Sequence, residues 1–490
     1  MEIYVEKTKP FLSPLDFIGD NLGEIPDAST LAAYQHWWTT QGKNISESVD
    51  RAGTPWLRMF DRNGTRIDEI CYSPDYWTML RKGYQQGIIS NVFEQNSLLP
   101  FYRIGYITAF YDSGLFCPYT VSLATAVPLE KYGNEALKTR FLKQLLRTND
   151  KVWQGATWMT EIKGGSDLGA NVDTTALQQN DHWLLNGDKY FASNLGAELA
   201  VVAARPQGAS HNVRGLALFL LPRIKQNGEL NYNIRRVKDK IATRSVPTGE
   251  VELRNSEAWL LGNCEQGIYL ILEVLNISRV ANSIASVALA QRAIAEATVF
   301  ARQRRAFGKA IIEHPLLQQQ FNEHCHDLQL AKALACKAAQ MLNVVWRQTP
   351  PYNDQYHLFR LLAHLAKYWT AEFAAQTCKW AMEVHGGLGV LAEYPVERWF
   401  REAMILSIWE GTSHRQILDG LEVMQRKAAH QSLFEALQKT AEPHALVELK
   451  SRIKRHLELP QQQLEAESEK LFSDLARFCA ETFLQENTNL

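Results

Sequence analysis

The sequence lacks several features that would each place it in a particular class of protein. No uninterrupted apolar run reaches the roughly eighteen residues that a membrane-spanning helix requires. Residues 1–11 show neither a signal-peptide core nor the Arg-rich, acid-poor composition of an organellar transit peptide. Lysine and arginine number 52 against 53 aspartate and glutamate residues, which gives a net charge of −1. This balance gives no general electrostatic reason for binding nucleic acid or an anionic membrane.

Cysteine is scarce, and common cofactor and metal motifs are missing. The seven cysteines are scattered and odd in number, which predicts reduced thiols in a cytoplasmic protein. The sequence contains no Cys-x-x-Cys pair, no His-Glu-x-x-His and no P-loop. His324 and His326 are two residues apart, so on a helix they point in nearly opposite directions, and we expect no metal site. Gly386-Gly387-Leu388-Gly389 follows a helical pattern instead of a strand, which excludes a nicotinamide-binding fingerprint.

Changes in hydrophobic period divide the 490 residues into four segments. Helical spacing of apolar residues gives way to short consecutive strands and then returns in long helices. Strands without intervening helices predict an antiparallel sheet instead of a Rossmann sheet, and helices of about thirty residues with apolar stripes predict a bundle. We therefore predict an α+β fold with an N-terminal helical domain (1–150), a middle antiparallel β-domain (151–262), a C-terminal helical bundle (263–425) and a short helical extension (426–490).

Local signals predict individual elements within these segments. Cys117-Pro118 is expected to separate two helices, and Asp61 to Gly64 to form a turn. Asn186-Gly187 lies between two strand-like runs and predicts a two-residue hairpin. Pro315 is expected at the first position of a long helix, where proline is tolerated. In the extension, Pro443 and Pro460 are expected to separate helices.

One carboxylate stands where its pKa could be raised. A helical pattern from Pro395 to Ile408 ends just before Trp409-Glu410-Gly411. An acid held beside bulky apolar groups is desolvated, which raises its pKa toward the range useful for proton abstraction. The residue pattern alone favours a plainer alternative, in which Glu410 is a solvated acid in the first turn of a following helix.

Two other stretches give no functional signal when each is taken alone. In the segment from Thr160 to Asp167, Gly164 and Gly165 allow close backbone approach between the hydroxyls of Thr160 and Ser166, although such a pattern is also a common turn. Residues 301–308 place three arginines within four positions, which alone would indicate a solvated turn.

These stretches share a resemblance to one family. The segment from Glu383 to Thr412 resembles the C-terminal signature of the acyl-CoA dehydrogenases, and its Ser-Ile-Trp-Glu-Gly form is most similar to their AidB-like branch. The Thr160 loop resembles the family's Thr-Glu-x-x-x-Gly-Ser-Asp loop. Residues 189–194 resemble its Lys-x-Trp-Ile-Thr-Asn strand, and residues 301–308 resemble its Arg-x-x-Phe-Gly loop. Residues 238–245 are also similar to the family, but we assign them no role.

The resemblance implies FAD as the cofactor. Phe191 would replace the usual tryptophan beside the isoalloxazine ring, and Ser193 would replace the threonine that reaches flavin N5. Arg304 would bind the pyrophosphate across a subunit interface, because a guanidinium donates two hydrogen bonds at once. The implied cofactor-binding residues are Met159, Thr160, Ser166, Phe191, Ser193, Arg304, Phe307, Glu383, Gly386, Gly387 and Thr412.

The resemblance also implies a reaction. Glu410 would remove the α-proton of an acyl thioester while the β-hydride passes to the flavin, which an electron acceptor such as electron-transfer flavoprotein would reoxidise. Some relatives carry the base just before an arginine on the first long helix. That position here is Ser278, before Arg279, and serine cannot act as the base. The implied substrate-binding residues are Ser166, Arg279, Trp409 and Gly411.

The implied protein is a cytoplasmic homotetramer that acts on acyl-CoA or another acyl thioester and has no membrane segment. The alternative is an AidB-like flavoprotein associated with nucleic acid, with weak or vestigial dehydrogenase activity. In that branch a basic C-terminal domain is thought to contact DNA. Residues 426–490 hold nine Lys/Arg and ten Asp/Glu, a net charge of −1, so we expect at most weak nucleic-acid binding.

Overall fold

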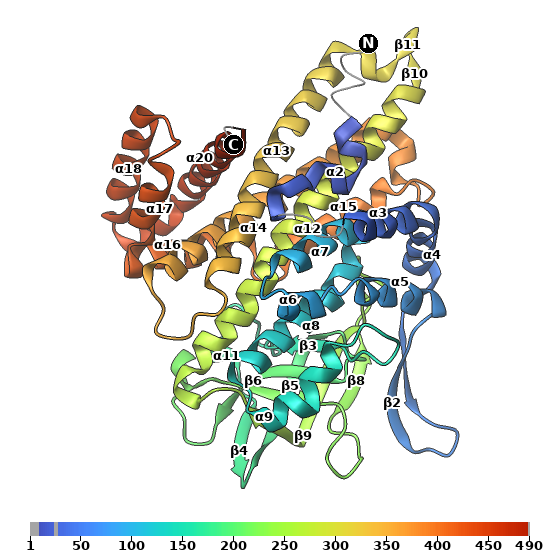
Figure 1. The fold of residues 1–490 in the computed structure, drawn as a ribbon, viewed down its shortest axis with the longest axis vertical. Helices are drawn as coiled ribbons and strands as arrows, with labels where there is room; N and C mark the ends of the chain where they lie inside the picture. Colours follow the sequence, from blue (N-terminus) through green and yellow to red (C-terminus); the bar gives the residue numbers. More distant parts are fainter. Residues whose placement is uncertain (1–8, 24–27, 489–490) are drawn as a thin grey trace. The chain divides into compact units, whose positions relative to one another are not determined.

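The structure is a computed structural model that describes residues 9–23 and 28–488 (Figure 1). The chain forms two compact units, and each is built from segments that are separated in the sequence. We call Met1–Ala28, Leu98–Tyr111 and Arg279–Leu490 the helical unit, and we call Ser29–Ser97 with Asp112–Ser278 the barrel unit. The N-terminal part of the chain is therefore shared between the two units.

Long helices form the helical unit, as the sequence predicts. Pro315 begins α13, where its missing N–H leaves no intrahelical hydrogen bond unmade, and α13 packs along α14. Helix α14 also packs against α15 and α16, which follow it in the chain. These elements are α2 (Pro14–Ile18), α7 (Leu99–Tyr111), α13 (Pro315–Val345), α14 (Asp354–His385), α15 (Val396–Ile408) and α16 (Ser413–Lys427).

The first predicted long helix is α12, which spans Gly267–Gln303. Within Cys264–Gln303, an 18-residue window reaches a mean hydropathy of 1.3, and by length and composition alone this segment would suit a membrane span. That window is 89% buried inside the structure. Because the core helix of a globular protein is apolar all round, this hydropathy is weak evidence for a membrane segment.

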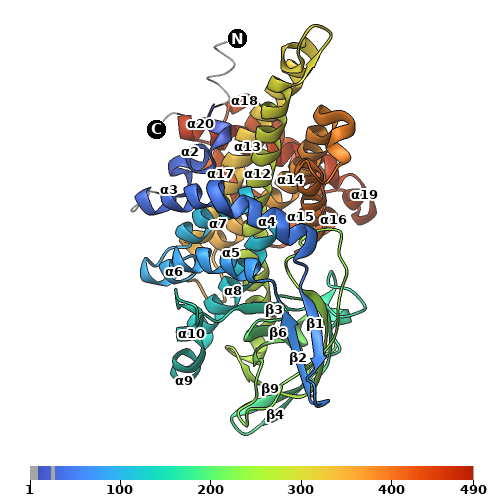
Figure 2. The same cartoon turned by 90° about the vertical axis from the view of Figure 1, so that its right-hand side faces the viewer.

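Residues 426–488 are helical, as predicted for the C-terminal extension. Pro443 lies in the first turn of α18 and Pro460 precedes α19, so both prolines mark helix starts. Helix α20 packs against α13 and α14 and buries Phe472, Leu475 and Phe483. The extension comprises α17 (Ala429–Leu437), α18 (Pro443–Leu457), α19 (Gln461–Ala466) and α20 (Ser468–Thr488), which are labelled in Figure 2.

A mixed sheet that closes on itself is the centre of the barrel unit. Its strands follow the order β3-β6-β4-β5-β9-β7, β8 pairs with β9, and an additional β6–β7 pairing completes the ring. Its buried core includes Trp158, Leu185 and Phe219. The strands are β3 (Gly155–Trp158), β4 (Thr175–Gln179), β5 (His182–Ser193), β6 (Leu199–Pro206), β7 (Ala217–Pro222), β8 (Asn233–Val237) and β9 (Thr248–Leu260).

Two expectations for the sheet need correction. The sheet is mainly antiparallel as predicted, but β6 pairs in parallel with both β3 and β4. The predicted Asn186-Gly187 hairpin is wrong, because β5 runs straight through these residues with an irregularity in its pairing to β9. Gly187 has φ 151° and packs so closely on Thr174 that a Cβ would lie 2.5 Å from its Oγ1. Gly187 therefore allows a β-bulge in β5. The turn between β4 and β5 is formed by Asn180 and Asp181.

The first 150 residues are mostly helical but also contain an unpredicted hairpin. Strands β1 (Trp56–Phe60) and β2 (Arg66–Cys71) pair around the predicted Asp61–Gly64 turn. The hairpin lies beside the barrel (Figure 2), where Arg66 Nη2 donates to Ile234 O at 3.0 Å and Ile234 N donates to Asp68 Oδ2 at 2.8 Å.

The predicted helix break at Cys117-Pro118 is wrong. Helix α8 runs through both residues, because Asp112 caps its start and its buried side chains outweigh the hydrogen bond that Pro118 cannot donate. The helices of the barrel unit are α3 (Ala28–Trp37), α4 (Lys43–Ala52), α5 (Pro74–Gln85), α6 (Ser90–Glu94), α8 (Ser113–Tyr132), α9 (Glu135–Leu137), α10 (Lys143–Leu145) and α11 (Leu168–Asn171).

Candidate functional site

Glu410 lies in a tight turn between two helices. Helix α15 ends at Ile408, and Thr412 caps α16 by accepting from Arg415 N at 3.4 Å. Between them, Glu410 has φ 57° and Gly411 has φ 98°. The left-handed region is costly for a residue with a side chain, so the surroundings must hold Glu410 there. Glu410 is half-buried in this turn, which rules out the plainer alternative of a solvated acid in the first turn of a helix.

Four side chains hold this turn by donating to its backbone carbonyls. Asn282 Nδ2 donates to Leu406 O at 2.9 Å. Lys367 Nζ donates to Ser407 O at 3.2 Å and to Gly411 O at 2.7 Å. Gln416 Nε2 donates to Glu410 O and Gly411 O, both at 3.0 Å. Arg279 Nε donates to Glu410 O at 3.4 Å.

These donors satisfy carbonyls that a helix end cannot satisfy internally. The two cations among them also lie at the C-terminal end of α15, where the helix dipole favours positive charge. We call Arg279, Asn282, Lys367 and Gln416 the carbonyl clamp, and each is at most 5% exposed. Gly411 is required for the same geometry, because a Cβ there would lie 2.6 Å from Gln416 Nε2.

A second set of contacts fixes the clamp itself. Arg279 Nη2 pairs with Asp419 Oδ2 at 3.2 Å, and Arg415 Nε donates to Asp419 Oδ1 at 2.7 Å. His364 Nδ1 lies 2.9 Å from Gln416 Oε1. Because Gln416 uses its nitrogen on two carbonyls, its oxygen must accept, and His364 therefore carries its proton on Nδ1.

In this cluster, burial and neighbouring opposite charges shift the pKa values of Glu410 and Lys367 in opposite directions. Burial raises the pKa of Glu410 from 4.5 to about 7, while Arg279 and Lys367 act in the opposite direction. Burial, followed by the charge of Arg279, lowers the pKa of Lys367 from 10.5 to about 7, and Glu410 opposes this shift. Burial also lowers the pKa of His364 to about 3, so this imidazole is neutral, in agreement with its single donor.

The predicted substrate residues of this unit therefore lie together. Trp409 and Gly411 are the neighbours of Glu410 in the sequence. Arg279 donates to the Glu410 carbonyl, and its side chain is buried within the carbonyl clamp. Sequence reasoning did not find Asn282, Lys367 or Gln416. The sequence did contain a signal for Lys367, because a lysine there interrupts the apolar positions of α14. In the structure Lys367 is 0% exposed among apolar neighbours.

In the barrel unit, one buried ion pair joins the two predicted cofactor motifs. Lys189 Nζ donates to Glu161 Oε1 at 2.7 Å and to Ala203 O at 2.8 Å. Glu161 also accepts from Asp173 N and Thr174 N, at 2.8 and 3.1 Å. Tyr190 N donates to Thr160 O at 3.0 Å. The Thr160 loop is thereby fixed against β5, with Met159 buried beneath it.

The adjacent residues of β5 present an aromatic ring and a hydroxyl. Phe191 and Ser193 alternate with Ala192, which is buried in the barrel core, so they share the other face of the strand. Phe191 is 55% exposed. Ser193 Oγ lies 3.0 Å from Thr248 Oγ1. Ser166 is exposed in the neighbouring loop.

The remaining predicted cofactor residues lie in the helical unit. Phe307, at the tip of the β10–β11 hairpin (Arg305–Ala306 and Lys309–Ala310), has φ 49° and is 95% exposed. Arg304 is exposed just before this hairpin. At the end of α14, a Cβ on Gly386 or Gly387 would meet nothing within 4 Å, and Glu383 pairs with Lys379 at 2.6 Å. Phe300 of α12 stacks on His385, with ring centroids 4.2 Å apart, so the two helix ends adjoin.

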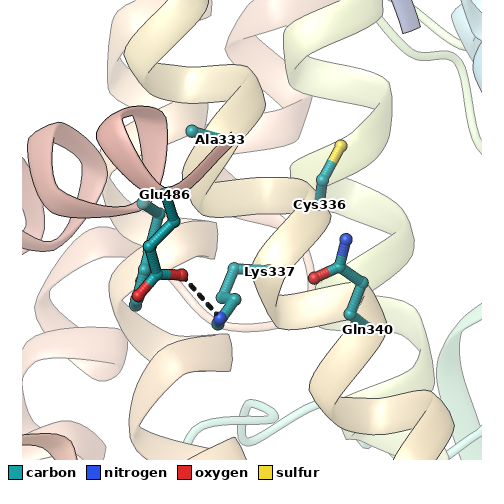
Figure 3. Close-up of a pocket in the computed structure, with 6 residues that line it drawn as sticks. Ala333, Cys336, Lys337, Gln340 and Glu486 are labelled. Atoms are coloured by element: carbon teal, nitrogen blue, oxygen red, sulfur yellow. Dashed lines mark hydrogen bonds and ion pairs between the residues drawn. The ribbon is translucent and has the colours of Figure 1, made fainter. Parts of the chain in front are cut away.

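Each unit holds groups that suit part of a flavin dinucleotide. In the barrel unit, Phe191 exposes much of its ring, and Thr160 and Ser193 carry hydroxyls. In the helical unit, Arg304 offers an exposed guanidinium suited to phosphate. A different hollow, lined by Ala333, Cys336, Lys337, Gln340, Phe483 and Glu486, lies between α13 and α20 (Figure 3). Its volume of about 10 Å³ has room for about one water, and the Lys337–Glu486 ion pair of 2.9 Å crosses it. It is too small for an organic substrate.

Comparison with known proteins gives matches along most of the chain. The profile of the acyl-CoA dehydrogenase C-terminal domain matches residues 265–425, and that of the acyl-CoA dehydrogenase middle domain matches residues 156–256. The profile of the adaptive response protein AidB N-terminal domain matches residues 23–150.

Three curated relatives illustrate the range of similarity. Acyl-CoA dehydrogenase family member 11 of Caenorhabditis elegans is 29% identical over 79% of this chain, which spans 66% of that protein's length. The putative acyl-CoA dehydrogenase AidB of Escherichia coli is 27% identical over 85% of this chain and 77% of its own length. The glutaryl-CoA dehydrogenase of Desulfococcus multivorans is 30% identical over 60% of this chain and 71% of its own length.

Solved structures share the whole architecture. The apo-form of Bd2924 superposes with a TM-score of 0.87 at 28% identity and covers 97% of both chains. The C. elegans protein ACDH-11 in complex with C11-CoA gives a TM-score of 0.86 at 24% identity, over 94% of this chain and 83% of that one. The second likeness establishes the fold alone.

Proposed function

The chain belongs to the acyl-CoA dehydrogenase family, and we propose that it removes hydrogen from the α and β carbons of an acyl thioester with Glu410 as the α-proton base. The observation that carries this proposal is the clamped turn. It holds a carboxyl with a pKa of about 7 in a left-handed conformation. A base that titrates near neutral pH is matched to taking a proton under physiological conditions.

The cofactor is FAD. Structures with this fold include an acyl-CoA dehydrogenase from Bacillus anthracis complexed with FAD and a glutaryl-CoA dehydrogenase from Mycobacterium smegmatis in complex with FADH2. When bound, FAD supplies a hydride acceptor. Thr160, Phe191, Ser193 and Arg304 would hold it, with the open Gly386-Gly387 turn.

The protein's own residues keep the base ready to accept a proton. Burial favours the neutral form of Glu410, while Arg279 and Lys367 favour its carboxylate, and the two effects meet near neutral pH. In the proposed step, the Glu410 carboxylate takes the α-proton and becomes neutral, which its buried position favours. The carbonyl clamp holds the backbone in place during this change, because its side chains donate to the backbone carbonyls of the turn.

We also propose acyl-CoA as the substrate class and an electron-transfer flavoprotein as the electron acceptor. Support comes from the C11-CoA complex of the C. elegans protein and from a 28% identical relative, the caffeyl-CoA reductase–Etf complex subunit CarC of Acetobacterium woodii. A cytoplasmic location is consistent with seven free cysteines. The proposed homotetramer is supported by the Arg304 hairpin, whose tip exposes nearly all of Phe307.

Glu410→Gln tests the proposal. The variant keeps the size of the side chain but cannot accept the proton, so anaerobic single-turnover flavin reduction by an acyl-CoA panel should slow by at least about a hundredfold. FAD content should stay unchanged. The control is Glu422→Gln, which removes a surface carboxylate that is 46% exposed and pairs with Arg426. Flavin reduction at the wild-type rate in Glu410→Gln would show that Glu410 is not the base.

Association with nucleic acid is the second candidate function, and the match to the AidB N-terminal domain favours it. The extension offers few cations for phosphate, because Arg452 pairs with Asp474 at 2.6 Å and Arg477 pairs with Asp327 at 3.3 Å. We therefore expect weak, salt-sensitive binding of duplex DNA. Tight binding that survives alanine substitution of Arg452, Lys454 and Arg455 together would favour this function and a different surface.

A further inference from the structure

A half-buried lysine, a buried threonine and a half-buried serine form one hydrogen-bonded row in the barrel unit. Thr248 at the start of β9 lies directly opposite Ser193 at the end of β5, and their hydroxyl oxygens are 3.0 Å apart. Lys240, in the connection between β8 and β9, donates to Thr248 Oγ1 at 3.1 Å. The same ammonium donates to Thr243 Oγ1 at 2.8 Å and to Val246 O at 2.9 Å.

The chemistry of these groups decides which atom donates and which accepts in each hydrogen bond of the row. An ammonium only donates, so Lys240 is the donor in each of these three contacts. Thr248 is 4% exposed, so leaving its hydroxyl hydrogen without an acceptor would be unfavourable. Ser193 Oγ is the acceptor in reach. Thr248 therefore donates to Ser193, and the hydrogen of Ser193 is free to point away from the row.

Ser193 is the outer end of this row. It shares a strand face with the exposed ring of Phe191, and among the described residues no second hydrogen-bond partner lies within reach of its hydroxyl. A hydroxyl that accepts from a donor polarised by an ammonium is itself a stronger donor, because hydrogen bonds in a chain polarise one another. The row thus transmits the influence of a positive charge to the hydroxyl of the half-buried Ser193.

We propose that Lys240, acting through Thr248, is a positioning residue that makes Ser193 an obligatory hydrogen-bond donor to the flavin and lowers the flavin's reduction potential. This inference rests on the proposed function, in which Ser193 faces FAD. The oxidised flavin would accept this bond at N5, whereas two-electron reduction would place hydrogen on N5, so an obligatory donor there favours the oxidised flavin. The proposal also gives residues 238–245 a role, since they contain Lys240 and bring its ammonium to Thr248.

Substitutions that interrupt the row at two points test the proposal. Thr248→Val keeps the shape of the side chain but removes the hydroxyl, and Lys240→Met keeps the length but removes the charge. Each should raise the equilibrium constant for two-electron reduction of bound FAD about tenfold, which is about 30 mV. The double variant should show the same shift as either single variant, because one break already interrupts the row.

The measurement is the midpoint potential of the FAD-loaded protein, obtained by reductive titration against a reference dye. Thr248→Ser keeps the row and should retain the wild-type potential, which separates loss of the hydroxyl from general disturbance of the strand. Thr175→Val removes a hydroxyl from the exposed strand β4 and should also leave the potential unchanged. FAD stoichiometry is determined for every variant.

Three results would overturn the proposal. These are an unchanged potential in Thr248→Val, an equal shift in Thr248→Ser, and additive shifts in the double variant, which would indicate that Lys240 acts through space. Failure of the proposed function would look different. It would appear in the wild-type protein, as absence of bound FAD or of flavin reduction by acyl-CoA, whereas dye titration of bound FAD needs no substrate.

Discussion

The position of Glu410 should reduce the stability of the folded protein at neutral pH. Its pKa is 4.5 in the absence of surrounding structure and about 7 in the fold. Between these values the folded state binds the proton more tightly, so stability falls as pH rises from 4.5 to 7 and is constant above that. At about 1.36 kcal/mol per pH unit, the loss is about 3 kcal/mol.

Glu410→Gln removes this titration while preserving the shape of the side chain. Near pH 4.5, wild type and variant should have similar free energies of unfolding, because the carboxyl is then mostly neutral. At pH 8 the variant should be more stable by up to about 3 kcal/mol. An active-site group that weakens the fold is an expected consequence of its function.

The assay is urea unfolding from pH 4.5 to 8.5, followed by circular dichroism. Both proteins need the same saturating FAD concentration, because a ligand of the folded state adds stability of its own. Glu422→Gln makes the same change of formal charge on the surface, and its difference from wild type should not vary with pH. The reasoning would be refuted if Glu410→Gln were less stable than wild type at pH 8, or if their difference were constant across the range.

Three further predictions concern the base, the cofactor and the assembly. Lys367→Met removes a cation that lowers the pKa of Glu410, so the rise of single-turnover flavin reduction with pH should move to higher pH; an unmoved profile would exclude this influence. Arg304→Ala should weaken FAD binding about tenfold in equilibrium dialysis, by loss of a charge-assisted phosphate contact. Arg305→Ala, whose guanidinium bonds Gly308 O at 3.0 Å within the hairpin, should weaken it less. Light scattering should show a homotetramer, and an FAD-loaded monomer at micromolar concentration would contradict the proposed assembly.

Much of the architecture could be predicted from the sequence because its signals are local. The periodicity of α12, α13 and α14, and the proline that starts α13, depend on residues within a few helical turns. Local signals misled where packing competed with them. Asn186-Gly187 became a bulge because Gly187 packs against Thr174, and α8 continues through Pro118 because its surroundings are buried.

The sequence by itself determined the order of the elements, the family resemblance and the identity of the candidate base. Only the tertiary structure decided how that base is held. Asn282, Lys367 and Gln416 reach the same turn from three different helices, and their hydrogen bonds end on backbone carbonyls that every residue possesses. The row from Lys240 to Ser193 likewise depends on the register of β5 and β9. A side chain that donates to a backbone carbonyl can pair with any type of residue. Its partner therefore cannot be recognised in the sequence and depends on packing.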